Sequence, residues 1–329
     1  MAHLVAQYLL LTLINHVFSR YIIRIRIIPI AMKVMKFGGT SVGSIESLIN
    51  LRDIVNAQDK PVVVVVSAMG GFTNQLLAMC EQAQQRDISC LDTLEAARKR
   101  HHDAVDSVVI ESMRQQVHDT IDRFIDDSLK PYYLALATNP HMPVDEIERV
   151  CDAIVAHGEI LSSAIVTGMF EDGMPHLSLN YMRTRPDGNG RVLDWDETGR
   201  LVQADFASLT EGGVHVAQGF ISRDKQSGDV TNLGRGGSDY TAAILAALLD
   251  AESLEIWTDV DGFMTADPRT HPDATVIPQM TYAQAQQMCD AGAKVIYPPT
   301  IAPVAMKHIP VWVKNTFNPD APGTVIVDD

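Results

Sequence analysis

Two glycine-rich segments, each with a cation beside the glycines, are the residues of this chain best suited to phosphate chemistry. The first is Lys-Phe-Gly-Gly-Thr-Ser-Val at 36–42, and the second is Gly-Arg-Gly-Gly-Ser-Asp at 234–239. Glycine lets the backbone approach a ligand closely, the N–H groups of a following helix point at an anion, and Lys or Arg neutralises it. Two such segments on one chain predict a kinase.

A third glycine pair, Gly70 and Gly71, follows Ser67 and precedes Thr73. A single glycine pair before a helix is more often a tight turn than a ligand site, but three pairs with polar side chains beside them favour phosphate binding. The P-loop pattern Gly-x-x-x-x-Gly-Lys-Ser/Thr is absent from the sequence, and Gly-x-Gly-x-x-Gly fails because Asp239 stands at its last position. A P-loop fold is therefore excluded.

Composition indicates a soluble globular protein with a substantial core, because 46% of the 329 residues are hydrophobic. The net charge of −15 argues against sequence-independent binding to nucleic acid or to an anionic membrane. The four cysteines form no Cys-x-x-Cys pair, so we expect reduced thiols and a cytoplasmic location. An acidic protein that binds polyphosphate must gather its few cations at the site.

The first 32 residues differ in composition from the rest. Residues 1–31 contain no acidic side chain, and Arg20, Arg24 and Arg26 lie among isoleucines. The apolar run precedes these arginines, unlike in a secretory signal, and it is too short and interrupted to span a bilayer. A transit peptide and upstream sequence joined to the reading frame both fit; we favour a dispensable extension before a domain at 33–329.

From residue 33 onward, apolar β-branched runs alternate with helical patterns, which is typical of an α/β sandwich. Predicted strands cover 34–37, 61–66, 214–217, 254–257 and 310–313, and the five valines at 62–66 indicate burial on both faces. Predicted helices cover 45–55, 73–84, 150–170, 239–249 and 281–290, with Thr73 and Thr281 as N-caps. The charged, glycine-free stretch 87–140 predicts external helices, and 183–200 predicts a loop or hairpin.

Seven segments, in their order along the chain, closely resemble the aspartate kinases of the amino acid kinase family. They are the first glycine segment at 36–42, Val-Ser-Ala at 66–68, His-Gly-Glu at 157–159, Gln-Gly-Phe at 218–220, Leu-Gly-Arg-Gly-Gly-Ser-Asp-Tyr-Thr-Ala at 233–242, Trp-Thr-Asp-Val-Asp-Gly at 257–262 and Gly-Ala-Lys-Val at 292–295. The resemblance implies a three-layer sandwich with an open, mainly parallel sheet between helices. It further implies an amino-acid lobe at about 33–200 and an ATP lobe at about 201–329, with ligands beyond the carboxyl ends of the strands.

The reaction implied by the resemblance transfers the γ-phosphoryl group of ATP to the β-carboxylate of L-aspartate, the first step of lysine, threonine and methionine biosynthesis. That nucleophile is ionised at pH 7, so catalysis relies on alignment and charge neutralisation rather than on a general base. Lys36 is the expected catalytic cation, with the amides of Gly38 and Gly39 around the same phosphate oxygens. Asp239 is the expected catalytic partner that orients Lys36 or the substrate; its alternative role is helix capping.

For aspartate itself, Arg235 offers a planar fork suited to the α-carboxylate, although an ordinary salt bridge is the alternative. The resemblance places Glu159 at the α-ammonium; without it, a Gly-Glu pair at a helix start more often serves the helix dipole. Thr73 and Ser238 complete the expected substrate residues, and capping alone would also explain Thr73.

For ATP, Thr258 and Asp259 are expected at the ribose and adenine, with Ser67 and Lys294, followed by Val295, near the phosphates. Arg269 is a weaker candidate. Met264 stands where relatives often carry tyrosine, so a hydroxyl contact to adenine is in doubt. Mg²⁺ is expected with ATP and needs few protein ligands, so the sequence names none.

Three alternatives remain open at this stage: glutamate 5-kinase, a nucleoside monophosphate kinase of the same fold, and a non-catalytic amino acid or nucleotide sensor. Arg235 and Glu159 suit a zwitterion better than a nucleotide, and the intact cations argue against lost activity. The chain ends where relatives continue into regulatory domains, so no feedback site is expected. A homodimer is possible.

Overall fold

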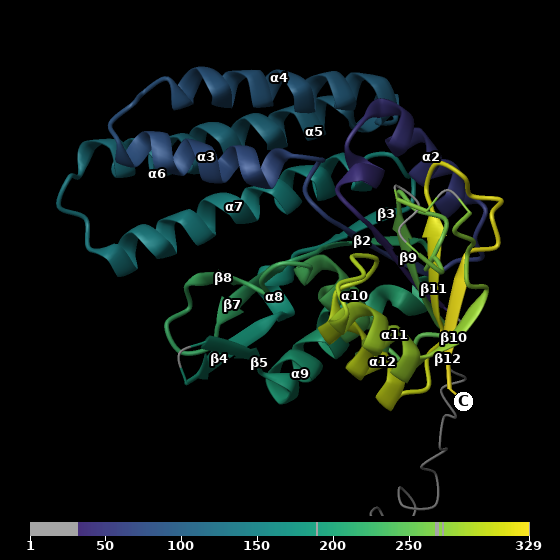
Figure 1. Cartoon of the computed structure of the whole chain (residues 1–329). Helices are drawn as coiled ribbons and strands as arrows, with labels where there is room; N and C mark the ends of the chain where they lie inside the picture. The colour runs from purple at the N-terminus through teal and green to yellow at the C-terminus, as the bar shows by residue number, and fades with distance from the viewer. Residues whose placement is uncertain (1–31, 189, 267–269, 272, 329) are drawn as a thin grey trace, which may run out of the picture. The chain divides into compact units, whose positions relative to one another are not determined.

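The structure, a computed structural model, describes residues 32–188, 190–266, 270–271 and 273–328 (Figure 1). All of these residues belong to one compact unit that covers 31–329. The expected dispensable extension lies almost wholly outside the described residues. The predicted division into two lobes near residue 200 stays a prediction.

An eight-stranded, mainly parallel sheet forms the centre of the unit, in the order β10-β12-β11-β9-β1-β2-β6-β3. Among the described strands of this sheet, β11 and β12 form the one antiparallel pair; β10 pairs parallel with β12, so these two strands run opposite to the other six. The strands are β1 (Lys33–Phe37), β2 (Val62–Val66), β3 (Gly173–His176), β6 (Val214–Gln218), β9 (Ser253–Thr258), β10 (Gln279–Thr281), β11 (Val311–Asn315) and β12 (Thr324–Val327). The predicted α/β fold with an open, mainly parallel sheet is confirmed.

The valines of β2 explain why helices cover both faces of this sheet. All five are fully buried. Val62, Val64 and Val66 belong to the core cluster that includes residues from α2 to α7, and because side chains alternate along a strand, Val63 and Val65 point to the opposite face. Helix α10 (Gly237–Leu248) packs there against β1, β2 and β9. The three layers of the predicted sandwich follow from this alternation.

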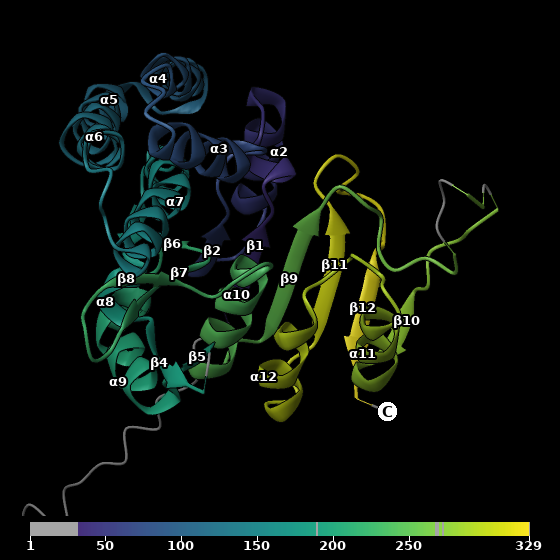
Figure 2. The same cartoon turned by 60° about the vertical axis from the view of Figure 1, so that its left-hand side comes forward.

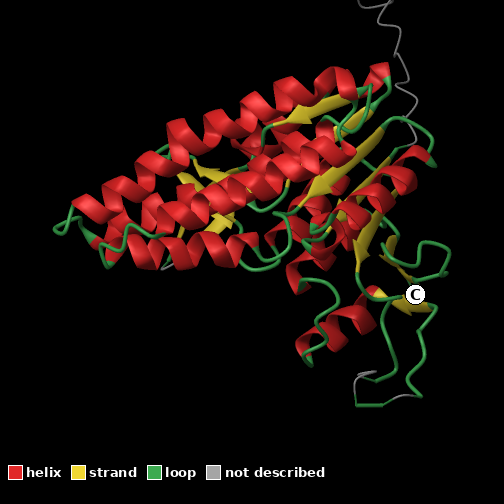
Figure 3. Cartoon of the chain, turned by 90° about the horizontal axis from the view of Figure 1, so that it is seen from above, coloured by secondary structure: helices red, strands yellow, loops and turns green. Residues whose placement is uncertain are grey.

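A group of long helices covers the first face, and seen from above these helices run side by side (Figure 3). They are α2 (Ile45–Asn56), α3 (Phe72–Gln84), α4 (Cys90–Val108), α5 (Glu111–Phe124), a π-helical turn (Ile125–Leu129), α6 (Lys130–Thr138) and α7 (Val144–Thr167). The prediction that 87–140 forms external helices is confirmed. Helix α7 has the length and hydropathy of a membrane span, but most of its apolar stretch is buried inside the fold, as in a core helix.

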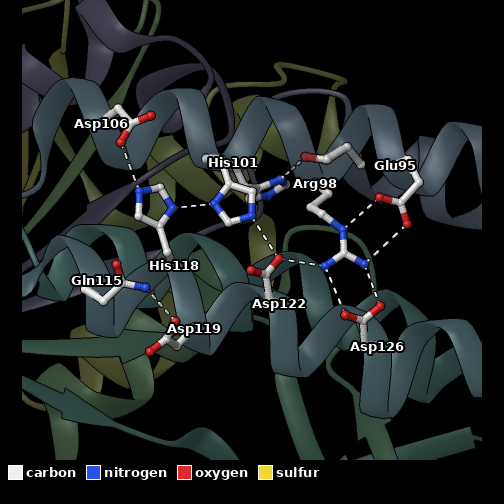
Figure 4. Close-up of polar contacts among 11 residues, drawn as sticks. Glu95, Arg98, His101, Asp106, Gln115, His118, Asp119, Asp122 and Asp126 are labelled. Carbon is white, nitrogen blue, oxygen red and sulfur yellow. Dashed lines mark hydrogen bonds and ion pairs between the residues drawn. The ribbon is translucent and has the colours of Figure 1, made fainter.

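A polar network joins α4 to α5 and to the π-helical turn (Figure 4). Arg98 of α4 lies within 2.9 Å of carboxylate oxygens from Glu95, Asp122 and Asp126. The network continues through His102, His118 and Asp106. Because partly exposed ion pairs contribute about 1 kcal/mol or less each, the network mainly fixes how the two helices lie against each other.

The opposite face carries α10 and, near the carboxyl end of the chain, α11 (Tyr282–Asp290) and α12 (Ile301–Met306) (Figure 2). A second sheet, in the order β5-β4-β7-β8, lies beside α8 (Ser178–Tyr181) and α9 (Trp195–Asp205). Its strands are β4 (Arg183–Asp187), β5 (Gly190–Leu193), β7 (Ile221–Asp224) and β8 (Val230–Asn232). Short 3₁₀ turns occupy Thr40–Val42, Ala207–Glu211 and Pro298–Thr300.

Three local predictions need correction. The N-cap of α3 is Gly71 at φ +79°, not Thr73. The chain enters this helix through a residue in the left-handed conformation, which glycine adopts readily. Helix α7 begins at Val144, so the His-Gly-Glu segment lies in its middle rather than at its start. The stretch 183–200 forms the predicted hairpin, but its last residues belong to α9. The Thr281 cap of α11 is confirmed by its capping box with Gln284.

Candidate active site

A cavity of about 340 Å³ opens beyond the carboxyl ends of β1 and β2, where the parallel strands of the sheet end at the same edge. Five separate chain segments line it: the end of β1 with the turn after it, the turn after β2 with the start of α3, the middle of α7, Phe220 between β6 and β7, and the loop that enters α10. Eight predicted site residues lie in its wall: Lys36, Gly39, Ser67, Thr73, Glu159, Arg235, Ser238 and Asp239. The two glycine segments that are two hundred residues apart in the sequence therefore meet at one cavity.

Lys36 and Asp239 form a buried ion pair in this wall. The Lys36 Nζ lies 2.6 Å from Oδ1 of Asp239, and the two side chains are 11% and 10% exposed. The other oxygen, Oδ2, accepts a hydrogen bond of 3.1 Å from the backbone N–H of Tyr297. Gly236 at φ +77° is the N-cap of α10, so Asp239 does not cap the helix as its alternative role required. The carboxylate instead holds the ammonium at the cavity.

The turns after β1 and β2 pack backbone to backbone, which is why glycine is needed in them. A Cβ on Gly39 would lie 3.2 Å from the carbonyl oxygen of Ala68, and a Cβ on Gly43 would lie 2.9 Å from that of Gly39. Gly38 donates its N–H to the carbonyl of Trp257 at 3.1 Å, so this amide serves the sheet. The prediction that Gly38 contributes its N–H to phosphate does not fit this bond, whereas Gly39 lines the cavity.

Glu159 projects from the middle of α7 and is 3% exposed. Its Oε1 accepts a hydrogen bond of 3.0 Å from the N–H of Ala68, and its Oε2 has no hydrogen-bond partner in the part of the chain that the structure describes. Burial raises the pKa of this carboxyl to about 8. The neighbouring Gly158 lets α7 approach the turn after β2, because a Cβ there would lie 2.6 Å from that of Ala68. The helix-dipole role considered for Glu159 does not apply in mid-helix.

Arg235 is exposed at the cavity, on the loop between Gly234 and Gly236. No carboxylate within the described residues pairs with it, so the ordinary salt bridge considered as its alternative is not formed there. Ser238 is buried beside it, and Gly219 leaves the space that the Ser238 side chain occupies. A guanidinium fork and a buried carboxylate oxygen thus face one cavity, which suits a ligand that carries both charges.

The sequence also resembles known proteins. The model of the amino acid kinase family matches residues 31–315. The chain belongs to the amino acid kinase family. Within that family, Escherichia coli aspartokinase III in complex with aspartate and ADP is similar to this chain with a TM-score of 0.79 and 30% identity, over 91% of this chain and 65% of that one. The predicted resemblance to aspartate kinases is confirmed.

Two curated members of the family are similar over 89% of this chain. Lysine-sensitive aspartokinase 3 of Escherichia coli strain K12 is 33% identical, over 63% of its own length. Bifunctional aspartokinase/homoserine dehydrogenase 2, chloroplastic, of Arabidopsis thaliana is 34% identical, over 32% of its own length. The chain therefore spans about a third of the bifunctional protein and less than two thirds of the Escherichia coli enzyme.

Of the residues predicted for the nucleotide, Lys36, Gly39 and Ser67 line the cavity, and the others that the structure describes do not. Thr258 ends β9 and Asp259 follows it, exposed at the same edge of the sheet; Met264 and Val295 are half-buried and Lys294 is exposed. Arg269 lies outside the described residues. In the part of the chain that the structure describes, no group of three or more His, Cys, Asp or Glu side chains could hold a metal ion. The nucleotide contacts stay predictions.

The sequence did not predict several residues at this cavity. Asn74 and Met69 line it beside the predicted Thr73 and Ser67, and Asn74 follows directly from Thr73 in the first turn of α3. Tyr297 was missed because its backbone N–H, rather than its side chain, contacts Asp239. No motif signals a backbone contact between segments fifty-eight residues apart.

Proposed function

We propose that this chain phosphorylates the β-carboxylate of L-aspartate with ATP to give 4-phospho-L-aspartate, in the cytoplasm, as the first step of lysine, threonine and methionine biosynthesis. One observation carries the proposal: a single cavity combines a buried lysine between glycine turns with a guanidinium and a carboxylate oxygen that have no partner among the described residues. The likeness to an aspartokinase solved with aspartate and ADP supports it.

The charges of the cavity support specific roles at the two ends of aspartate. Arg235 binds the α-carboxylate through its planar fork. The free Oε2 of Glu159 accepts the α-ammonium, and the hydroxyls of Thr73 and Ser238 lie in the same wall. Because the β-carboxylate is already ionised, no side chain has to remove a proton from the nucleophile.

Lys36 neutralises the charge on the transferred phosphoryl group. Asp239 holds its Nζ by the 2.6 Å ion pair, so the ammonium is fixed before ATP arrives and needs little reorganisation. The nucleotide lies toward Thr258, Asp259 and Lys294 at the neighbouring end of β9. Mg²⁺ would enter with ATP, would supply positive charge at the phosphates, and would need few protein ligands.

A direct assay tests the proposal. The full chain receives Mg-ATP and a panel of amino acids, while ADP release and hydroxylamine-trapped acyl phosphate are followed. We expect turnover with L-aspartate and little with L-glutamate, because one extra methylene moves the carboxylate away from Lys36. Equal turnover with glutamate contradicts the substrate assignment, and nucleotide binding without turnover favours a sensor.

A further inference from the structure

The side chain of Arg100, on α4, joins the two glycine turns from behind the cavity. Its Nη2 donates one hydrogen bond of 2.8 Å to the carbonyl oxygen of Gly43 and another of 3.0 Å to that of Gly70. Gly43 follows the turn after β1, and Gly70 lies in the turn after β2. One guanidinium nitrogen therefore ties together the two turns that line the phosphoryl end of the cavity.

The bond to Gly70 fixes the direction of a cavity-facing amide. Gly70 O and Gly71 N belong to one peptide unit, and in a planar trans peptide the C=O and N–H point in opposite directions. Arg100 holds the carbonyl on the helix side, so the N–H of Gly71 points away from α4. Gly71 lines the cavity, and its N–H has no backbone acceptor among the described residues. This amide precedes the first turn of α3. The unbonded N–H groups of that turn contribute to the partial positive charge at the N-terminus of the helix.

Arg100 also brings charge that no carboxylate cancels. It is half-buried, and no ion pair to it occurs in the described part of the chain. Burial lowers the pKa of its guanidinium, which still remains charged at neutral pH. Nearby Arg98 contrasts with it: two positions away, it projects about 200° around the helix and is paired with three carboxylates (Figure 4).

We propose that Arg100 is a positioning residue for phosphoryl transfer: it clamps the two glycine turns and aims the Gly71 N–H at the transferred group. The inference rests on the proposed function. Loss of the clamp leaves Arg235 and Glu159 in place, so aspartate still binds. Without the clamp, the Gly71 amide loses its alignment and the two turns lose their fixed spacing around Lys36. Both features position and stabilise the reacting phosphoryl group.

The test compares Arg100→Met with Arg98→Met in the full chain; both variants keep an unbranched apolar stem on α4. For Arg100→Met we expect kcat to fall about 10- to 100-fold, with the KM for aspartate within about threefold of wild type. For Arg98→Met we expect wild-type kcat and a small loss of thermal stability. An Arg100→Ala variant should regain part of its kcat when methylguanidinium is added.

A second measurement separates failure of this inference from failure of the proposed function. Amide hydrogen exchange of the segment 67–74 needs no turnover, and we expect it to be faster in Arg100→Met and unchanged in Arg98→Met. If wild type shows no aspartate kinase activity but exchange responds in this way, the clamp stands and the reaction assignment falls. Any of three results overturns the inference. They are a kcat and an exchange rate in Arg100→Met equal to those of wild type, an equal loss of kcat in Arg98→Met, or no rescue of Arg100→Ala by methylguanidinium.

Discussion

Aspartate binding is expected to depend strongly on pH because of Glu159. This carboxyl is 3% exposed, and burial raises its pKa to about 8. One oxygen accepts a hydrogen bond from the Ala68 N–H, and the other has no hydrogen-bond partner within the described residues. In the empty cavity at pH 7, about one molecule in ten carries the ionised form. An ammonium group beside it favours that ionised form and lowers the pKa.

The size of the effect follows from linkage between proton release and binding. If only ionised Glu159 accepts the α-ammonium, the apparent Kd for aspartate falls about tenfold between pH 6 and 7, about fivefold more by pH 8, and little above that. Close to one proton should be released per aspartate bound at pH 7. Isothermal titration in buffers of different ionisation enthalpy, with ADP present, measures both the Kd and the protons released.

The matched control is Glu159→Gln, which keeps the shape of the side chain and cannot ionise. Glu159→Gln should bind aspartate more weakly than wild type at pH 8, with a Kd that is nearly constant from pH 6 to 8. A flat profile for wild type, or an equal slope in Glu159→Gln, would refute the assignment of Glu159 to the ammonium.

The same shift predicts how stability changes with pH. The pKa of Glu159 is raised from 4.5 to about 8 on folding, so its contribution is fully present below pH 4.5 and is lost as pH rises toward 8. The loss is about 1 kcal/mol per pH unit at most. In thermal denaturation, the melting temperature of wild type should therefore fall relative to that of Glu159→Gln as the pH rises across this window.

Two further predictions concern Lys36 and Gly158. Lys36→Ala should lower kcat by about two orders of magnitude or more, since it removes a preorganised cation. The control Lys33→Ala, at the far end of the same strand, should leave kcat unchanged. Steady-state ADP release measures both, and an unaltered kcat in Lys36→Ala would show that Lys36 has no role in catalysis. Gly158→Ala should cost about 1–3 kcal/mol of stability, because its Cβ would lie 2.6 Å from Ala68 Cβ. Gly190→Ala, whose Cβ would meet only the Asp187 carbonyl at 3.8 Å, should leave the stability nearly unchanged. Equal melting temperatures for Gly158→Ala and Gly190→Ala would contradict the packing argument.

Local sequence was sufficient where neighbouring residues decide the structure. The five valines of β2 predicted burial on both faces, and all five are buried. Thr281 and Gln284 form a capping box within one turn of α11, so the start of that helix was predicted correctly. The strands with a consistent apolar pattern were located to within a residue or two.

Prediction failed where distant residues decide. Thr73 looked like the N-cap of α3, but the chain must turn sharply after β2 and uses Gly71 at φ +79°. The Gly158-Glu159 pair looked like a helix start because glycine lowers helix propensity; the glycine is there to admit Ala68 from another segment. Arg100 had no signal at all, since its partners are 57 and 30 residues away.

The site itself was predicted through its glycines and cations rather than through its geometry. Eight of the predicted residues line the cavity, because parallel strands bring their carboxyl ends to one edge whatever their separation in sequence. The nucleotide residues around Thr258 and Lys294 do not share that wall, and their roles stay predictions.

The distribution of charge explains how a chain of net charge −15 could bind the ATP that the proposed function requires. Lys36 is neutralised by Asp239, and Glu159 is largely protonated at pH 7 because of its raised pKa. Arg235 and Arg100 have no carboxylate partner among the described residues, so the empty site carries a net positive charge while the rest of the molecule is acidic. In the proposed function, the ammonium of aspartate lowers the pKa of Glu159 so that its proton is released, and Arg235 and Arg100 remain to balance the carboxylates and phosphates. The protonation of one buried carboxyl thus keeps the site attractive to anions until the zwitterion is bound.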